Sequence, residues 1–283
     1  MLQNLSVTFD WRRQLSAIRQ GLTTYGAAAT AHEHLALAGA LRCRQIRPRR
    51  IAVIGSKGGV GTTTAAVLLA SVLSAARKDQ TLLLTLHSDV SDVAARLAVP
   101  HAPSVSHVLD GLRRTGRIPP TPVTRTGLRV LSAPPAGSPA IETGLGALLD
   151  VAATGHGSVV VDAGVANRLG SLGSLAALFD TVVLACGTTS DAVAATAAVL
   201  TRWRDRQPTL DATRLILAPV RIRPAPRRAG SDPVDSLLVD GLASHALPHD
   251  PELGHGRAIE MGALSGPSMT AWLRLGADIM AGR

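Results

Sequence analysis

The chain has 283 residues, of which 46% are hydrophobic and 17% are charged, and this balance excludes an intrinsically disordered protein. Its net charge of +9 comes almost wholly from arginine, while only 2% of its residues are aromatic, which argues against a base-stacking platform for RNA or single-stranded DNA. Two cysteines are too few for a disulfide scaffold, and no run reaches the roughly 18 apolar residues of a membrane span. We therefore expect a cytoplasmic protein.

The first 48 residues differ in composition from the rest of the chain. They are rich in Ala and Arg, place leucines such as Leu37 and Leu41 at helical spacing, and end at Pro48. This pattern predicts a helical N-terminal extension over residues 1–48, followed by an α/β domain over residues 49–283.

From Arg49 onward, short runs of apolar residues alternate with longer stretches of helix-like composition. This order is typical of repeated βαβ units, and strands that are apolar on consecutive residues are expected to be covered on both faces. We predict a three-layer α/β fold with a mostly parallel sheet. The strands are expected at residues 51–54, 81–86, 128–131, 158–161, 181–186 and 215–217. The helices are expected at residues 63–77, 90–98, 104–114, 141–153, 169–179, 191–204 and 269–280.

Local signals refine these expected elements. Ser88 or Asp89 is expected to cap the helix at residues 90–98, and Ser190 is expected to cap the helix at residues 191–204. Residues 224–235 predict an exposed loop. The apolar residues of the final helix are expected to pack against the sheet rather than to enter a membrane, because its polar side is short of basic residues.

A glycine-rich segment joins the first strand to the first long helix. Its glycines, Gly58, Gly59 and Gly61, let successive backbone N–H groups converge on an oxyanion, and the helix N-terminus adds partial positive charge. Lys57, one of only two lysines in the chain, lies within the same segment. An ordinary strand-to-helix connection or a dinucleotide turn is less favoured, since the spacing is not Gly-x-Gly-x-x-Gly. The segment predicts a polyphosphate site.

The residues of this segment resemble a known family. The run from Lys57 to Thr63 is similar to the deviant Walker A motif of the ParA/MinD ATPases, which belong to the SIMIBI class of P-loop NTPases. Other segments resemble the family's Walker B strand, its third strand and its C-terminal signature. These are residues 159–162, 128–134, and 247–250 with 258–262.

The resemblance implies a P-loop NTPase fold and a homodimer that forms around Mg²⁺ and ATP. Lys57 and Asp162 would be the catalytic residues: Lys57 would reach the phosphates bound by the partner subunit, and Asp162 would hold the metal through water. Thr63 would bind Mg²⁺ through its hydroxyl group. The nucleotide-binding segment would comprise Lys57, Gly58, Gly59, Val60, Gly61, Thr62, Thr63 and Thr64. The alternative role for Asp162 is to cap the turn after its strand, and Thr64 is expected only to satisfy backbone donors.

Three departures from the family pattern weaken the expectation of catalysis. Thr62 stands where the motif has a second lysine. The second strand ends in Thr85, Leu86 and His87, where the family usually has an aspartate pair, and Asp89 or Asp92 would have to replace it. Ala218 stands where an asparagine after the sixth strand often recognises adenine.

Several functions remain open. The family implies a switch that positions or regulates a larger assembly, such as chromosome or plasmid partition, septum, pilus or secretion machinery, with recruitment to the nucleoid, a pole or a membrane by partners. The departures also permit a degenerate module that binds ATP without hydrolysing it. Arginine clusters permit a protein that binds DNA without sequence specificity. They lie at residues 42–50, 202–206 and 221–228.

Overall fold

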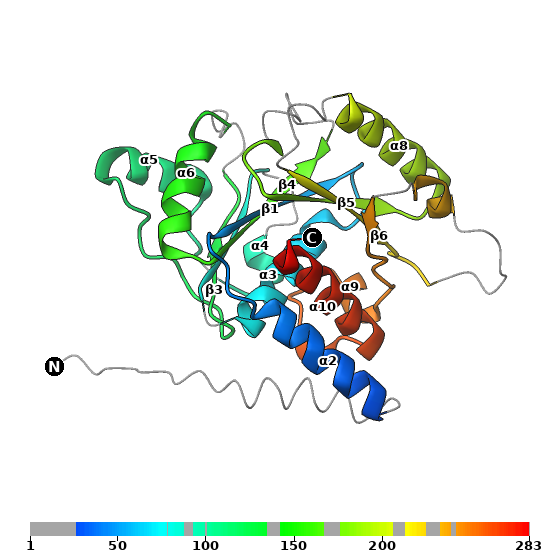
Figure 1. Cartoon of the computed structure of the whole chain (residues 1–283). Helices are drawn as coiled ribbons and strands as arrows, with labels where there is room; N and C mark the ends of the chain where they lie inside the picture. The colour runs from blue at the N-terminus through cyan, green and yellow to red at the C-terminus, as the bar shows by residue number, and fades with distance from the viewer. Residues whose placement is uncertain are drawn as a thin grey trace.

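A computed structural model describes residues 27–77, 79–87, 93–99, 101–134, 142–166, 176–205, 213–224, 233–238 and 242–282. Within these residues, seven strands form one sheet in which every pair is parallel (Figure 1). The strands are β1 (Arg49–Gly55), β2 (Thr81–Thr85), β3 (Leu128–Leu131), β4 (Ser158–Val165), β5 (Thr181–Gly187), β6 (Arg214–Val220) and β7 (Ala243–Ser244).

The strand order is β3-β2-β4-β1-β5-β6-β7. All six predicted strands are confirmed, and their apolar residues are buried because helices cover both faces of the sheet. The chain leaves β1 toward one edge of the sheet and returns through β4 before it continues to the other edge. The carboxyl ends of β1 and β4 therefore lie at a topological switch point, where open α/β sheets bind their ligands.

Helices pack in two layers, one on each face. The first core cluster joins the sheet to α3 (Thr62–Ala76), α4 (Val93–Arg96) and α10 (Gly266–Ala281). The second joins the opposite face to α5 (Val105–Thr115), α6 (Glu142–Gly155) and α8 (Ser190–Arg204). Trp272 and Ile279 of α10 are fully buried in the first cluster, so the prediction that the last helix packs on the sheet is confirmed.

The described part of the N-terminal region contains helix α2 (Ala27–Leu41), which lies beside α10 (blue and red in Figure 1). Leu41 is completely buried against α3 and α10. His34 Nε2 lies 2.6 Å from the Thr270 hydroxyl, and Arg274 Nε donates to Glu33 at 2.6 Å. These contacts attach α2 to the layer that carries the glycine-rich segment.

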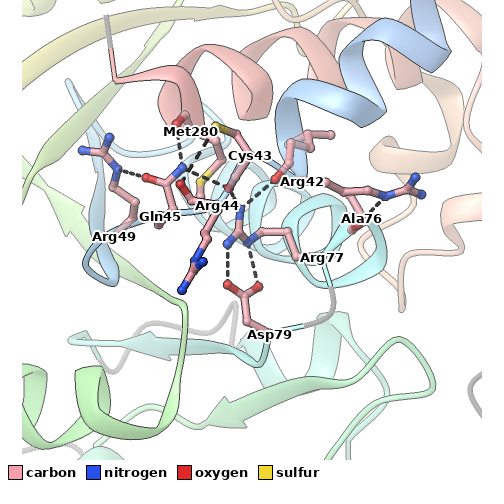
Figure 2. A network of polar contacts seen from close by, with 10 residues as sticks. Arg42, Cys43, Arg44, Gln45, Arg49, Ala76, Arg77, Asp79 and Met280 are labelled. Atoms are coloured by element: carbon pink, nitrogen blue, oxygen red, sulfur yellow. Dashed lines mark hydrogen bonds and ion pairs between the residues drawn. The ribbon is translucent and has the colours of Figure 1, made fainter.

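The loop after α2 is held by polar contacts at the opposite end of α3 from the glycine-rich segment (Figure 2). Arg77 donates to the carbonyl oxygens of Leu41 and Cys43 at 2.8 and 3.1 Å, and pairs with both carboxylate oxygens of Asp79. Gln45 donates to the last turn of α10 through the carbonyl oxygen of Met280 at 2.9 Å. The bonds to the Leu41 and Met280 carbonyls satisfy groups at helix ends that have no intrahelical partner.

Some expected features differ from the structure or fall outside the described residues. The N-cap of α8 is Thr189, so the prediction of Ser190 was wrong by one position. Strand β7 was not predicted, since its two residues carry no periodicity. Several sequence predictions fall outside the described part, including residues 225–232 of the expected loop. The others are residues 1–26, Ser88, Asp89, Asp92, residues 167–175, Arg206, Arg227 and Arg228. Short elements also occur at η3 (Pro233–Leu237), α9 (Pro251–Gly254) and η4 (Met261–Ala263).

Candidate nucleotide-binding site

The glycine-rich segment leaves the carboxyl end of β1 and enters α3. Gly59 and Gly61 have φ of +77° and +89°, which glycine adopts without strain, and Gly61 is the N-cap of α3. The first bond of the helix runs from the Ala65 amide to the Gly61 carbonyl at 2.8 Å. The amides of the first turn before Ala65 therefore have no acceptor within the helix and are free to bind an anion.

Space for such an anion exists beside two of the glycines. A Cβ atom added to Gly58 or Gly59 would meet nothing within 4 Å. The base of the segment is tightly packed, however, because a Cβ on Gly55 would lie 2.1 Å from the Thr62 hydroxyl oxygen. Ser56 ties the segment to β5 through its amide, which donates to the Ala185 carbonyl at 2.9 Å. The segment is thus fixed at its base and open around its glycines.

The three threonines have different surroundings. Thr62 and Thr63 are buried, and the Thr62 hydroxyl lies against Gly55. The Thr64 hydroxyl accepts a hydrogen bond of 2.9 Å from Arg96 Nη2, which connects α3 to α4. The buried Arg96 also donates to the Arg257 carbonyl at 3.0 Å. The sequence predicted that Thr64 would only satisfy backbone donors. Instead, its hydroxyl accepts a hydrogen bond from the Arg96 side chain.

Asp162 lies on β4 beside the segment, in register with Val53 of β1 and Thr85 of β2. Because its neighbour Val161 belongs to the cluster on the opposite face, strand alternation places Asp162 on the face that α3 covers. Thr63, in the first turn of α3, and Asp162 are thus on the same face of the sheet. The carboxylate of Asp162 is completely buried.

The two oxygen atoms of Asp162 have different partners. Oδ1 accepts a hydrogen bond of 3.2 Å from the Gly164 amide, but β4 continues to Val165, so this bond lies within the strand rather than in a turn that follows it. Oδ2 lies 3.0 Å from His87 Nε2 but has no hydrogen-bond partner of good geometry among the described residues. The Thr85 hydroxyl, on the same face, is also buried without such a partner. Oxygen donors of this kind suit Mg²⁺, so the residues present fit a divalent cation.

Lys57 forms an ion pair with Asp191, which lies in the first turn of α8. The Thr189 hydroxyl also donates to Asp191, at 2.5 Å. The hydrogen bonds from Lys57 and Thr189 lower the pKa of the Asp191 carboxyl to about 2. Asp191 therefore stays ionised in all neutral and mildly acidic conditions and pairs with Lys57 of the same chain.

Sequence reasoning did not identify Asp191 or His87 as site residues. Asp191 follows β5 and His87 follows β2, and a usable signal was present, since the carboxyl ends of parallel strands meet at one edge of a sheet. Ala218 was expected to follow the sixth strand, and this placement was wrong. Ala218 is completely buried inside β6, and Arg221, Ile222 and Arg223 are the residues that follow this strand.

Comparison with solved structures identifies the fold. A ParA family ATPase from Chlorobium tepidum TLS superposes with a TM-score of 0.61 at 14% identity, covering 81% of this chain and 98% of the other. The fold is that of the ParA/MinD ATPases. The septum site-determining protein MinD of Pyrococcus horikoshii OT3, in complex with Mg-ADP, gives a TM-score of 0.62 at 14% identity, covering 81% and 94%.

An ATP complex of a McdA variant from Cyanothece also has this ParA/MinD fold, with a TM-score of 0.59 at 13% identity and coverage of 82% and 96%. No model of a protein family matches the sequence, and no curated protein matches it. The described residues contain no helix of sufficient length and hydropathy to cross a bilayer.

Proposed function

We propose that this protein is an ATP-binding switch that dimerises around Mg²⁺ and ATP. The observation that carries the proposal is the segment from Gly55 to Thr64, which presents free amides and open space at the topological switch point of a ParA/MinD fold. Solved structures with the same fold include one with Mg-ADP and one with ATP, which supports this choice of ligand.

In this proposal the residues of the site have separate tasks. The amides around Gly58 and Gly59 and those of the first turn of α3 bind phosphate oxygens. The Thr63 hydroxyl and the Asp162 carboxylate hold the cation. Bound Mg²⁺ would supply positive charge against the phosphate oxygens.

Lys57 would connect the two subunits. Its side chain is 41% exposed, and its partner Asp191 is 65% exposed, so the ion pair is accessible and can be exchanged for another anion. We propose that Lys57 leaves Asp191 to bind the phosphates held by the second subunit. Dimerisation would then depend on nucleotide, and the dimer would present a surface that the monomer lacks.

A second candidate is a module that binds ATP and does not hydrolyse it. Two observations favour it: Thr62 supplies no positive charge next to the phosphates, and the imidazole of His87 lies against the Asp162 carboxylate. Both candidates dimerise in response to nucleotide, so we propose nucleotide-dependent dimerisation as the primary function. If ATP is hydrolysed, Lys57 and Asp162 would carry out that slow reaction.

Assembly with partners is the biological output that we propose for the switch. Residues 49–283 would form the nucleotide-binding domain. The helical extension of residues 1–48 would contact this domain through α2, which packs against α10. The proposed cargo is partition, septum or secretion machinery, including pili. Recruitment by such partners would take a cytoplasmic protein to the nucleoid, a pole or a membrane.

A basic surface that binds DNA is the third candidate function. It is less favoured at residues 42–50, where Arg47 and Arg50 pair with Asp180 and Asp150.

The test is calorimetry with Mg²⁺ and ATP, followed by measurement of molar mass. We expect the wild-type chain to bind ATP and to double its mass only with nucleotide. Lys57→Ala should still bind ATP but remain monomeric, whereas the matched control Lys78→Ala, which removes the chain's other lysine, should behave like the wild type. Absence of heat at millimolar ATP would refute the proposal.

Measurement of phosphate release distinguishes the slow ATPase from the module that does not hydrolyse ATP. A slow ATPase should lose its turnover in Lys57→Ala, whereas a binding module has no turnover to lose.

A further inference from the structure

His87 stands beside the carboxylate that the proposed function assigns to the cation. The parallel ladder of β2 and β4 continues one residue past β2, because the Leu86 amide donates to the Asp162 carbonyl at 2.9 Å. The next residue, His87, is two positions from Thr85 and so returns to the face that α3 covers. Its side chain is 15% exposed, and that of Asp162 is fully buried.

The backbone at Gly164 leaves room for the imidazole ring. A Cβ atom on Gly164 would lie 2.9 Å from His87 Cδ2, so only glycine leaves room for the ring. Gly164 also has φ of +72°, a conformation that glycine adopts without strain. The same residue donates its amide to Asp162 Oδ1. Gly164 therefore lies beside both the histidine ring and the carboxylate.

The distance between the two side chains suits shared coordination of one ion. Two ligand atoms bonded at right angles to a cation, each about 2.1 Å from it, are separated by about 3.0 Å. His87 Nε2 and Asp162 Oδ2 are 3.0 Å apart. Among the described residues, Asp162 Oδ2 has no hydrogen-bond partner of good geometry. The neighbouring Thr85 hydroxyl is also buried without such a partner.

The geometry points to a cation site in which His87 is a ligand next to Asp162, which makes the site selective for a divalent transition-metal ion over Mg²⁺. Imidazole nitrogen is a ligand that transition metals accept readily, while Mg²⁺ prefers oxygen donors. The sequence supports this change of ligand, since Leu86 and His87 follow the second strand directly and neither is a carboxylate. The inference rests on the proposed function, which places the nucleotide's cation at this position.

The experiment uses the full chain with ADP and Mn²⁺, and records electron spin-echo modulation from nitrogen nuclei coupled to Mn²⁺. Labelling the protein with ¹⁵N-histidine separates histidine nitrogen from adenine nitrogen. We expect a histidine signal in the wild type and in His107→Ala, which changes an exposed histidine on α5, and no signal in His87→Ala. Calorimetry should show that His87→Ala weakens Mn²⁺ binding to the ADP complex about tenfold or more. Mg²⁺ binding should change by less than about threefold.

Two results would overturn the inference, and they differ from failure of the proposed function. Wild-type protein that lacks a histidine signal would show that His87 is not a ligand. Tighter Mg²⁺ binding in His87→Ala would show that the imidazole only obstructs the carboxylate. ADP binding measured without metal tests the proposed function separately: its absence refutes the nucleotide site itself and removes the basis of the inference.

Discussion

Lys57 and Asp191 form an ion pair that joins the glycine-rich segment after β1 to the first turn of α8. Because the two strands that precede these residues, β1 and β5, are adjacent and parallel, their carboxyl ends bring the residues together. The pair holds the side chain that the proposed dimer must use. A change at Asp191 therefore tests what this pair does.

We predict that Asp191→Asn promotes nucleotide-dependent dimerisation, because it releases Lys57 from its partner within the subunit. Both side chains are exposed, so the dimer dissociation constant should fall by no more than about fivefold. Sedimentation with Mg²⁺ and ATP measures this constant. Asp110→Asn, which removes an exposed carboxylate paired with Arg113, is the control and should have no effect. Weaker dimerisation in Asp191→Asn would mean that Asp191 supports the interface.

The Lys57–Asp191 pair should persist in acid. Since the carboxyl pKa is held at about 2, below its ordinary 3.8, the stabilising interaction is complete above pH 3.8 and is lost only as the pH falls through about 2. The effect of Asp191→Asn on dimerisation should therefore be the same at pH 6 and pH 8. A difference between these two values would assign the effect to another group.

Two glycines of the segment should respond differently to alanine. Gly61→Ala should lower the free energy of unfolding by about 1 to 3 kcal/mol, because alanine is strained at a φ of +89° and its Cβ would lie 3.2 Å from Val220 Cγ1. Gly58→Ala should leave this free energy within about 0.5 kcal/mol, because a Cβ there meets nothing. Urea titrations of the two variants measure the difference.

Gly58→Ala should nevertheless impair the site. Its methyl group would occupy the space beside the amides that we propose to bind phosphate, so ATP affinity should fall about tenfold or more. Calorimetry on this correctly folded variant measures the loss. Unchanged ATP affinity in Gly58→Ala would place the phosphates elsewhere.

Arg77 is expected to be a main stabilising contact between α2 and the sheet domain (Figure 2). Arg77→Ala removes two bonds to backbone carbonyl groups and the pairing with Asp79, and should lower the free energy of unfolding by roughly 2 to 4 kcal/mol. Arg113→Ala is the matched control. Its pair with Asp110 is exposed, so the loss should stay below about 0.5 kcal/mol. Equal losses in the two variants would contradict this account.

Stability should depend on pH through His34, which lies between α2 and α10. Burial lowers the pKa of His34 below its ordinary 6.5, while Glu33 acts to raise it and Arg274 to lower it further. The unfolded chain therefore binds the proton more readily, and the free energy of unfolding decreases as the pH falls below about 6.5.

His34→Gln should reduce this dependence. Urea titrations from pH 7.5 to pH 5 should show a smaller decrease in the free energy of unfolding than in the wild type. His107→Gln, at an exposed position on α5, should retain the wild-type slope. If the slopes of both variants match the wild type, His34 does not control acid stability.

The sequence alone determined the strands, the glycine-rich segment and its family resemblance, because these depend on local signals. Runs such as Val159–Val161 are apolar on consecutive residues and predict buried strands, and glycines before a helix predict an anion site. Such signals need only the order of neighbouring residues. The six longest strands are therefore predicted correctly, and the order of residues from Lys57 to Thr64 predicts a phosphate-binding segment without any knowledge of its conformation.

Only the tertiary structure decided the partners of these residues. Asp191 is 134 positions from Lys57, and His87 is 75 positions from Asp162, which no local pattern relates. Their proximity comes from the order of parallel strands, which places the carboxyl ends of β2, β4, β1 and β5 side by side. The position of α2 on α10 was likewise decided by packing, since His34 contacts Thr270, which is 236 positions away in the sequence. Sequence spacing determines what each segment becomes, whereas the close packing of side chains determines which segments meet.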